Sequence, residues 1–137
     1  MTRIKINLPE KFNFKTELAI RIDDLNYGQH LANDRILAFA HEARVQFLKS
    51  LGYGELTFAG VGLIMSDAAI SFRAEAFHGD LLIIELGVVE LSKFGFDLIY
   101  KISDKSTNKE VASVKTAMVC FDYQKRKIAL IPQEAKD

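Results

Sequence analysis

Hydrophobic and polar positions follow two different periods along this chain. Between residues 33 and 51, apolar residues recur every three or four positions, which predicts a helix with one buried face. These positions are Ile36, Ala40, Ala43, Phe47 and Leu51. After residue 61, apolar and polar positions alternate instead, as they do in strands that cover a core with one face.

The predicted helix has signals at both ends. Asn33 stands at the expected N-cap position, and Asp34 in the first turn complements the helix dipole. Gly52 and Gly54 follow the last apolar position and end the helix. A helix of about 17 residues spans about 25 Å, which is enough to cross a strongly curved sheet.

The other apolar segments predict strands. Residues 14–22 form the first strand and residues 23–32 a loop, and turns such as His78-Gly79-Asp80 separate the later strands. The later strands are predicted at 68–75, 81–91, 96–102, 111–123 and 128–131. Because strands joined by short turns pair antiparallel, the fold class is α+β: one long helix wrapped by a curved antiparallel sheet of about five or six strands.

Length and composition fit one folded unit that needs no disulfide or metal. The chain has 137 residues, 49% of them hydrophobic, and no repeat, low-complexity tract or linker interrupts it. We therefore expect residues 1–137 to form a single domain. The lone Cys120 lies in an apolar strand segment, where a small core residue is expected.

Charge and hydropathy exclude several classes of partner. Lys and Arg together number 18, as do Asp and Glu, so neither nucleic acid nor an anionic membrane surface is expected to bind. No apolar run approaches the roughly 20 residues of a membrane span. Residues 1–14 lack the apolar stretch of a signal peptide. We therefore expect a cytoplasmic protein.

One segment of the helix predicts self-association. Residues 36–40, with the sequence Ile-Leu-Ala-Phe-Ala, are apolar almost all round the helix. Such a segment is buried on more than one side, and a single sheet covers only one of them. A second subunit would cover the other side, so we expect a homodimer or homotetramer.

Residues 21–37 carry a combination that resembles a known family. They read Arg-Ile-Asp-Asp-Leu-Asn-Tyr-Gly-Gln-His-Leu-Ala-Asn-Asp-Arg-Ile-Leu, and the helix continues at 41–48 with His-Glu-Ala-Arg-Val-Gln-Phe-Leu. This order of acid, turn, His, Asn and helix resembles the 4-hydroxybenzoyl-CoA thioesterase family and is similar to the plant acyl-ACP thioesterases. The turn His78-Gly79-Asp80 and residues 119–122 and 128–132 extend the likeness over roughly residues 15–132.

The resemblance implies a hotdog-fold acyl-CoA thioesterase that needs no cofactor, with coenzyme A as part of its substrate. One residue departs from the family pattern. The catalytic Asp of the family, the second acid of Asp-x-Asp, is Asn26 here, while Asp24 keeps the first. An amide orients water or bonds the thioester carbonyl but does not remove a proton. Asn26 before Tyr27 and Gly28 is equally typical of a turn.

Hydrolysis of a thioester needs hydrogen-bond donors for the developing oxyanion and a group that positions or activates water. The N–H groups near Asn33 and Asp34 would be suitable donors, because the first N–H groups of a helix are unpaired. This role is compatible with Asn33 as a cap. His30, shortly before the helix, is either a proton shuttle or carbonyl donor, or an ordinary loop residue.

Two helix residues compete for a further role. Glu42 falls in a polar stripe of the helix and is the weaker candidate. His41 falls among apolar side chains, where it is either functional or a satisfied core histidine. Counted from Asn26, it also lands where some related thioesterases place a helix-borne catalytic carboxylate. Because His41 lies about 12 Å along the helix from Asn33, it would serve the site of a neighbouring subunit.

The phosphates of coenzyme A would require basic residues at the mouth of a pocket. Arg73 and Lys93, on or next to predicted strands, are the candidates, although both could be ordinary solvated residues. The three His are scattered along the chain and do not predict a metal site.

Two other functions remain open at this point. A hotdog dehydratase or hydratase would show a sharper His/Asp pair than this sequence has. A catalytically weak hotdog protein would only bind acyl-CoA or acyl carrier protein.

Overall fold

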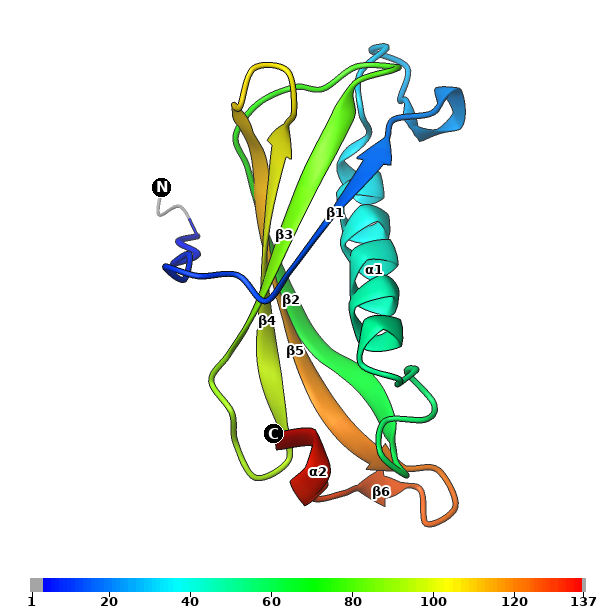
Figure 1. Ribbon diagram of the computed structural model, residues 1–137. Helices are drawn as coiled ribbons and strands as arrows, with labels where there is room; N and C mark the ends of the chain where they lie inside the picture. The colour runs from blue at the N-terminus through cyan, green and yellow to red at the C-terminus, as the bar shows by residue number, and fades with distance from the viewer. Residues whose placement is uncertain (1–3, 137) are drawn as a thin grey trace.

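The computed structural model describes residues 4–136 and shows one long helix packed on a six-stranded antiparallel sheet (Figure 1). The helices are α1 (Asn33–Ser50) and the short α2 (Gln133–Lys136), and a 3₁₀ turn, η1, spans Ile22–Asp24. The strands are β1 (Phe14–Ala19), β2 (Gly62–Phe72), β3 (Leu81–Val89), β4 (Gly95–Asp104), β5 (Glu110–Asp122) and β6 (Lys127–Ile128).

The sheet has the order β1-β3-β4-β5-β2, with the short β6 paired to β5. All of these pairs are antiparallel, so the predicted α+β class with one helix and a curved antiparallel sheet is confirmed. The first strand ends at Ala19 rather than at residue 22, because η1 begins there and turns the chain toward α1. Strand β2 starts at Gly62, earlier than predicted, and lies at one edge of the sheet.

The core lies between α1 and the face of the sheet that carries Ile84, Leu98 and Tyr100. Four of the five periodic helix positions are buried there as predicted: Ile36, Ala40, Ala43 and Phe47. Leu51 is 55% exposed, because α1 ends at Ser50 and Leu51 is its C-cap. Ala40 and Ala43 are completely covered, so the backbone of α1 lies close to the sheet along its middle.

The predicted N-cap is wrong by one residue. Ala32, in an extended conformation, is the N-cap, and the helix has no side-chain cap hydrogen bond. Asn33 is the first helical residue instead. The start of the helix is fixed by a backbone contact rather than by a side-chain cap, since Ala32 donates its N–H to the carbonyl of Asp24 at 3.0 Å.

The two ends of α1 lie at opposite ends of the molecule (Figure 1), separated by about 27 Å for an 18-residue helix. The loop at 20–32 lies at the start of α1, while β6 and α2 lie toward its end. Within residues 36–40 only part of the helix surface is covered: Ile36, Phe39 and Ala40 are buried, Leu37 is half-buried and Ala38 is exposed. No helix within residues 4–136 is long and apolar enough to cross a membrane.

Candidate active site

The loop before α1 is a narrow, hydrogen-bonded turn. Leu25 and Leu31 form an antiparallel bridge across its base. Inside it, the Asn26 N–H donates to the carbonyl of His30 at 3.0 Å, and the Asn26 side-chain oxygen accepts the N–H of Gly28 at 2.8 Å. The interpretation of Asn26 as a turn former is therefore confirmed. Its side-chain oxygen is used by the turn, which leaves the amide NH₂ as the group that can act on a ligand.

Gly28 brings the side chains of Asn26 and His30 close together. A Cβ atom built on Gly28 would lie 3.2 Å from the Asn26 oxygen and 3.2 Å from His30 Nε2. A side chain at position 28 would therefore press on both predicted site residues.

Asp24 anchors this turn to the start of the helix. Its side chain is only 3% exposed, and its carboxylate accepts the N–H of Arg21 at 2.8 Å. Its own carbonyl accepts the N–H of Ala32, the N-cap of α1. The first acid of the Asp-x-Asp pair is thus a structural residue that fixes where the loop meets the helix.

A hollow of about 330 Å³ opens between this loop, the first turn of α1 and the segment after β2. His30 and Asn33 line it from one side, and Arg73 and Glu75 from the other. The N–H of Leu31 donates to the carbonyl of Ala76 at 2.7 Å, which fixes the two sides relative to each other. The structure therefore brings His30, Asn33 and Arg73, three predicted site residues, to one place.

Hydrogen bonds within the chain only partly satisfy the groups that line the hollow. His30 Nδ1 lies 3.2 Å from the Leu31 carbonyl, and its Nε2 lies 3.9 Å from the Glu75 carboxylate. Arg73 pairs with Glu110 at 3.4 Å but remains partly exposed. In the first turn of α1, Arg35 donates to the Ala32 carbonyl, whereas within residues 4–136 the N–H groups of Asn33 and Asp34 have no acceptor. Two backbone donors at a helix start, beside a His and an Arg, can hold an oxyanion.

Lys93 does not line this hollow, so the structure does not bring the two basic candidates together. It lies in the loop between β3 and β4, where its carbonyl accepts the N–H of Ile131. On β5, the partner of Phe72 is Ala112 and the partner of Gly95 is Val119, which separates the two places by about 23 Å along the strand. The sequence does not show which end of a sheet a loop occupies, and here the two basic residues occupy opposite ends.

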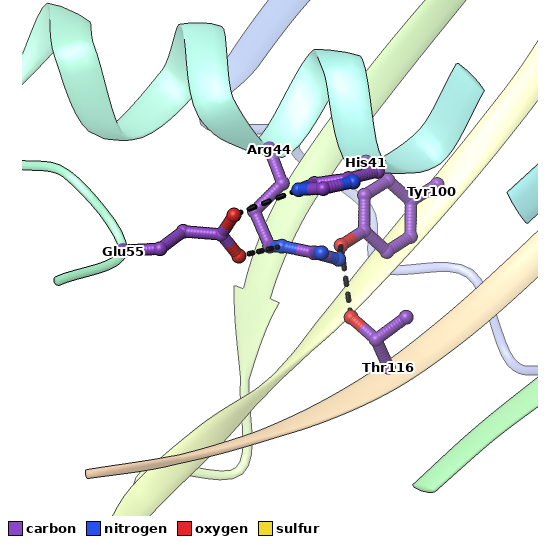
Figure 2. A network of polar contacts seen from close by, with 5 residues as sticks. All are labelled: His41, Arg44, Glu55, Tyr100 and Thr116. Carbon is purple, nitrogen blue, oxygen red and sulfur yellow. Dashed lines mark hydrogen bonds and ion pairs between the residues drawn. The ribbon is translucent and has the colours of Figure 1, made fainter. Parts of the chain in front are cut away.

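The two helix candidates have different surroundings. Glu42 is exposed and bonded to Gln46 at 2.7 Å, as expected for a solvated stripe. His41 is 54% exposed, so it is not a core histidine, and its Nε2 lies 2.7 Å from the carboxylate of Glu55 (Figure 2).

Sequence reasoning missed Glu55 as the partner of His41. It lies in the loop after α1, 14 residues from His41, in a segment without periodicity. Burial raises the pKa of Glu55, but the hydrogen bond from His41 and the charge of Arg44 outweigh burial and hold this pKa below its usual value. Arg44 belongs to the Glu-Ala-Arg segment at 42–44, which was the only feature of the sequence that pointed to the region of His41 and Glu55.

Comparison with known proteins identifies the family of this chain. The sequence profile of the thioesterase-like superfamily matches residues 20–137. The 1,4-dihydroxy-2-naphthoyl-CoA hydrolase of Synechocystis sp. is 31% identical over 123 residues, which are 88% of this chain and 89% of that protein. The long-chain acyl-CoA thioesterase FadM of Escherichia coli is 26% identical over 124 residues, which are 90% of this chain and 94% of that protein.

A solved structure extends the comparison to three dimensions. The crystal structure of a 1,4-dihydroxy-2-naphthoyl-CoA thioesterase from Synechocystis matches with a TM-score of 0.82 at 26% identity, over 90% of this chain and 92% of that one. One helix on a curved antiparallel sheet is the hotdog fold, which this chain shares with that thioesterase. This chain belongs to the thioesterase-like superfamily, and it is a thioester hydrolase.

The anchoring role of Asp24 generates a first prediction. In Asp24→Ala the Arg21 N–H loses its acceptor, and we expect the free energy of unfolding to fall by about 1–2 kcal/mol. The matched control is Asp23→Ala, which removes an exposed neighbouring carboxylate and should stay within about 0.5 kcal/mol of the parent. Urea unfolding of the three proteins measures both values. Equal stability of the two variants would contradict an anchoring role for Asp24.

Proposed function

We propose that this chain hydrolyses the thioester of a fatty or aromatic acyl-CoA in the hollow at the start of α1. The observation that carries the proposal is that Asn33, whose N–H has no acceptor within residues 4–136, meets His30 and Arg73 around one space. The relatives support the substrate class, because they are named as hydrolases of a naphthoyl-CoA and of long-chain acyl-CoA.

Each group has a distinct task in this reaction. The thioester carbonyl oxygen accepts hydrogen bonds from the free N–H groups at the helix start. These bonds stabilise the negative charge that develops when water adds. The amide of Asn26 and the ring of His30 orient the water. Arg73 at the mouth of the hollow binds a phosphate of coenzyme A. The carbon–sulfur bond then breaks, and the products are a carboxylate and the free thiol.

Self-association is the second part of the proposal. Strand β2 has 11 residues and lies at the edge of the sheet, so one row of its backbone N–H and C=O groups faces outward. Met65 and Phe72 on this strand are 42% and 41% exposed. Pairing of β2 with a second copy would satisfy the backbone groups and cover these side chains, giving a homodimer or a homotetramer of dimers. We also propose a cytoplasmic location for the enzyme.

The rival function is a hotdog protein that only binds acyl-CoA, which the amide at position 26 would favour. A panel of fatty and aromatic acyl-CoA substrates, with thiol release as the readout, separates the two. We expect hydrolysis well above the buffer rate for at least one substrate. Binding of acyl-CoA in calorimetry without any hydrolysis across the panel would overturn the proposed reaction and favour the binding protein.

The proposed role of Asn26 in orienting water can be tested by mutation. In Asn26→Ala the amide that orients water is lost, so we expect kcat/KM to fall about 10-fold, the effect of one hydrogen bond at the reacting centre. Asn26→Asp keeps the turn, because a carboxylate also accepts the Gly28 N–H, and it should keep or raise activity by adding a base. Thermal melts exclude unfolding. If Asn26→Ala retains the full parental rate, Asn26 serves only the turn.

The edge-strand interface predicts an even number of subunits in solution. Light scattering at micromolar concentration should give twice or four times the 15.4 kDa chain mass. In the variant Met65→Lys, a charge on the exposed edge strand β2 should shift the protein toward monomer. The matched control is Leu130→Lys, which changes a residue that is also exposed but lies outside the sheet. A monomeric parent protein would contradict the interface.

A further inference from the structure

A chain of polar contacts runs from the surface of α1 into the sheet (Figure 2). His41 Nε2 lies 2.7 Å from Glu55 Oε1, and Arg44 Nε donates to the other carboxylate oxygen at 3.0 Å. Behind them, the Arg44 guanidinium donates to the Tyr100 hydroxyl at 3.2 Å, which lies 2.8 Å from the Thr116 hydroxyl. The outer member, His41, is exposed, while Arg44, Tyr100 and Thr116 are buried.

The charges in this chain fix the tautomer of His41. Arg44 is always protonated, and the carboxylate of Glu55 has a lowered pKa, so Glu55 is ionised at neutral pH and only accepts hydrogen bonds. His41 Nε2 must therefore carry the hydrogen of this bond. In the neutral ring Nδ1 then keeps its lone pair, and within residues 4–136 no group bonds to it.

We propose that His41 is the general base of the thioesterase and that Glu55 is the residue that positions it. This rests on the proposed function, and it supplies the proton acceptor that the amide of Asn26 cannot be. A base oriented by a carboxylate, which is itself held by a third group, is the arrangement that activates weak nucleophiles in hydrolases. Here the nucleophile is water.

In the proposed step, His41 transfers one proton from the attacking water to the leaving sulfur. His41 Nδ1 takes a proton from water as the water oxygen bonds to the thioester carbon, and the resulting imidazolium is stabilised by the charge of Glu55. When the carbon–sulfur bond breaks, the imidazolium returns this proton to the leaving sulfur, which departs as the thiol. The water's oxygen remains in the carboxyl product.

The distance along α1 determines which hollow His41 serves. It lies eight residues after Asn33, about 12 Å along the axis, which is too far for the hollow of its own chain. His41 therefore acts in the hollow of the second subunit. Its exposure on α1, next to the exposed Ala38 and Val45, leaves it free to face that subunit.

The fold itself does not need His41. The loop that carries Glu55 is held by the ion pair with Arg44 and by the bond from the Leu63 N–H to the Glu55 carbonyl at 2.6 Å. If these contacts served only the fold, the pair of Arg44 and Glu55 would be sufficient. This difference makes the proposal testable by kinetics without loss of the folded protein.

The first experiment compares kcat/KM as a function of pH for four variants of the full chain. His41→Ala should lose about 100-fold in kcat/KM, the lower range for a general base. Glu55→Gln should lose about 10-fold, because the ring of His41 is no longer held by an ionised acceptor. His41 is paired with Glu55 from the loop after α1, and the other carboxylate oxygen of Glu55 binds Arg44. Tyr100 from β4 contacts Arg44, and Thr116 from β5 contacts Tyr100.

Two variants are the controls. Glu55→Asp keeps the carboxylate and should recover part of the activity. Glu17→Gln removes a carboxylate from an exposed ion pair with Lys105 and should behave as the parent protein. Active parent protein together with parental rates and pH profiles for both His41→Ala and Glu55→Gln would overturn this proposal alone. Inactivity of the parent protein toward every acyl-CoA would overturn the proposed function and this proposal together.

The second experiment tests the assignment to the partner's hollow. Asn33→Pro removes one N–H donor at the helix start, and the extended Ala32 before it tolerates a proline. Hybrids of this variant with His41→Ala should recover about a quarter of the parental activity, since half of randomly paired dimers are mixed and each has one intact site. No recovery after verified subunit exchange would overturn it.

Discussion

The structure depends on the burial of one face of α1 against the curved sheet. Ala40 and Ala43 are completely covered, so the helix lies close to the strands and its direction is fixed from end to end. A fixed direction places the helix start beside the end of β2 and creates the hollow between them. The same burial places Arg44 in the core, where an unpaired charge would be strongly destabilising. Glu55 and Tyr100 are the groups that make its burial possible.

Much of this fold is encoded locally and was therefore predictable. The spacing of Ile36, Ala40, Ala43 and Phe47 fixes the helix, and alternation with polar turns fixes the later strands, because both patterns report which face meets the core. The ends of elements were less predictable. Asn33 has the right chemistry for a cap, but the backbone of Asp24 binds the N–H of Ala32 and sets the start of the helix one residue earlier.

The site shows the same distinction between features encoded locally and features set by the folded chain. Asn26 and His30 come together through hydrogen bonds within one short loop, so their order in the sequence was enough to identify them as neighbours. Glu75 and Glu55 approach His30 and His41 only in the folded chain. The separation of Lys93 from Arg73 was not visible in the sequence for the same reason, since the end of the sheet that a loop occupies depends on strand register and not on local sequence.

The amide at position 26 has a chemical consequence that the turn does not explain. The turn uses only the side-chain oxygen, which accepts the N–H of Gly28, and a carboxylate would accept that bond equally well. What distinguishes asparagine here is its NH₂ group, a donor that does not titrate. A site built around it holds a carbonyl or a water by hydrogen bonds and needs its base on another element. In this chain His41, which is bonded to an ionised carboxylate and has one ring nitrogen without a bond within residues 4–136, has the chemistry of that base.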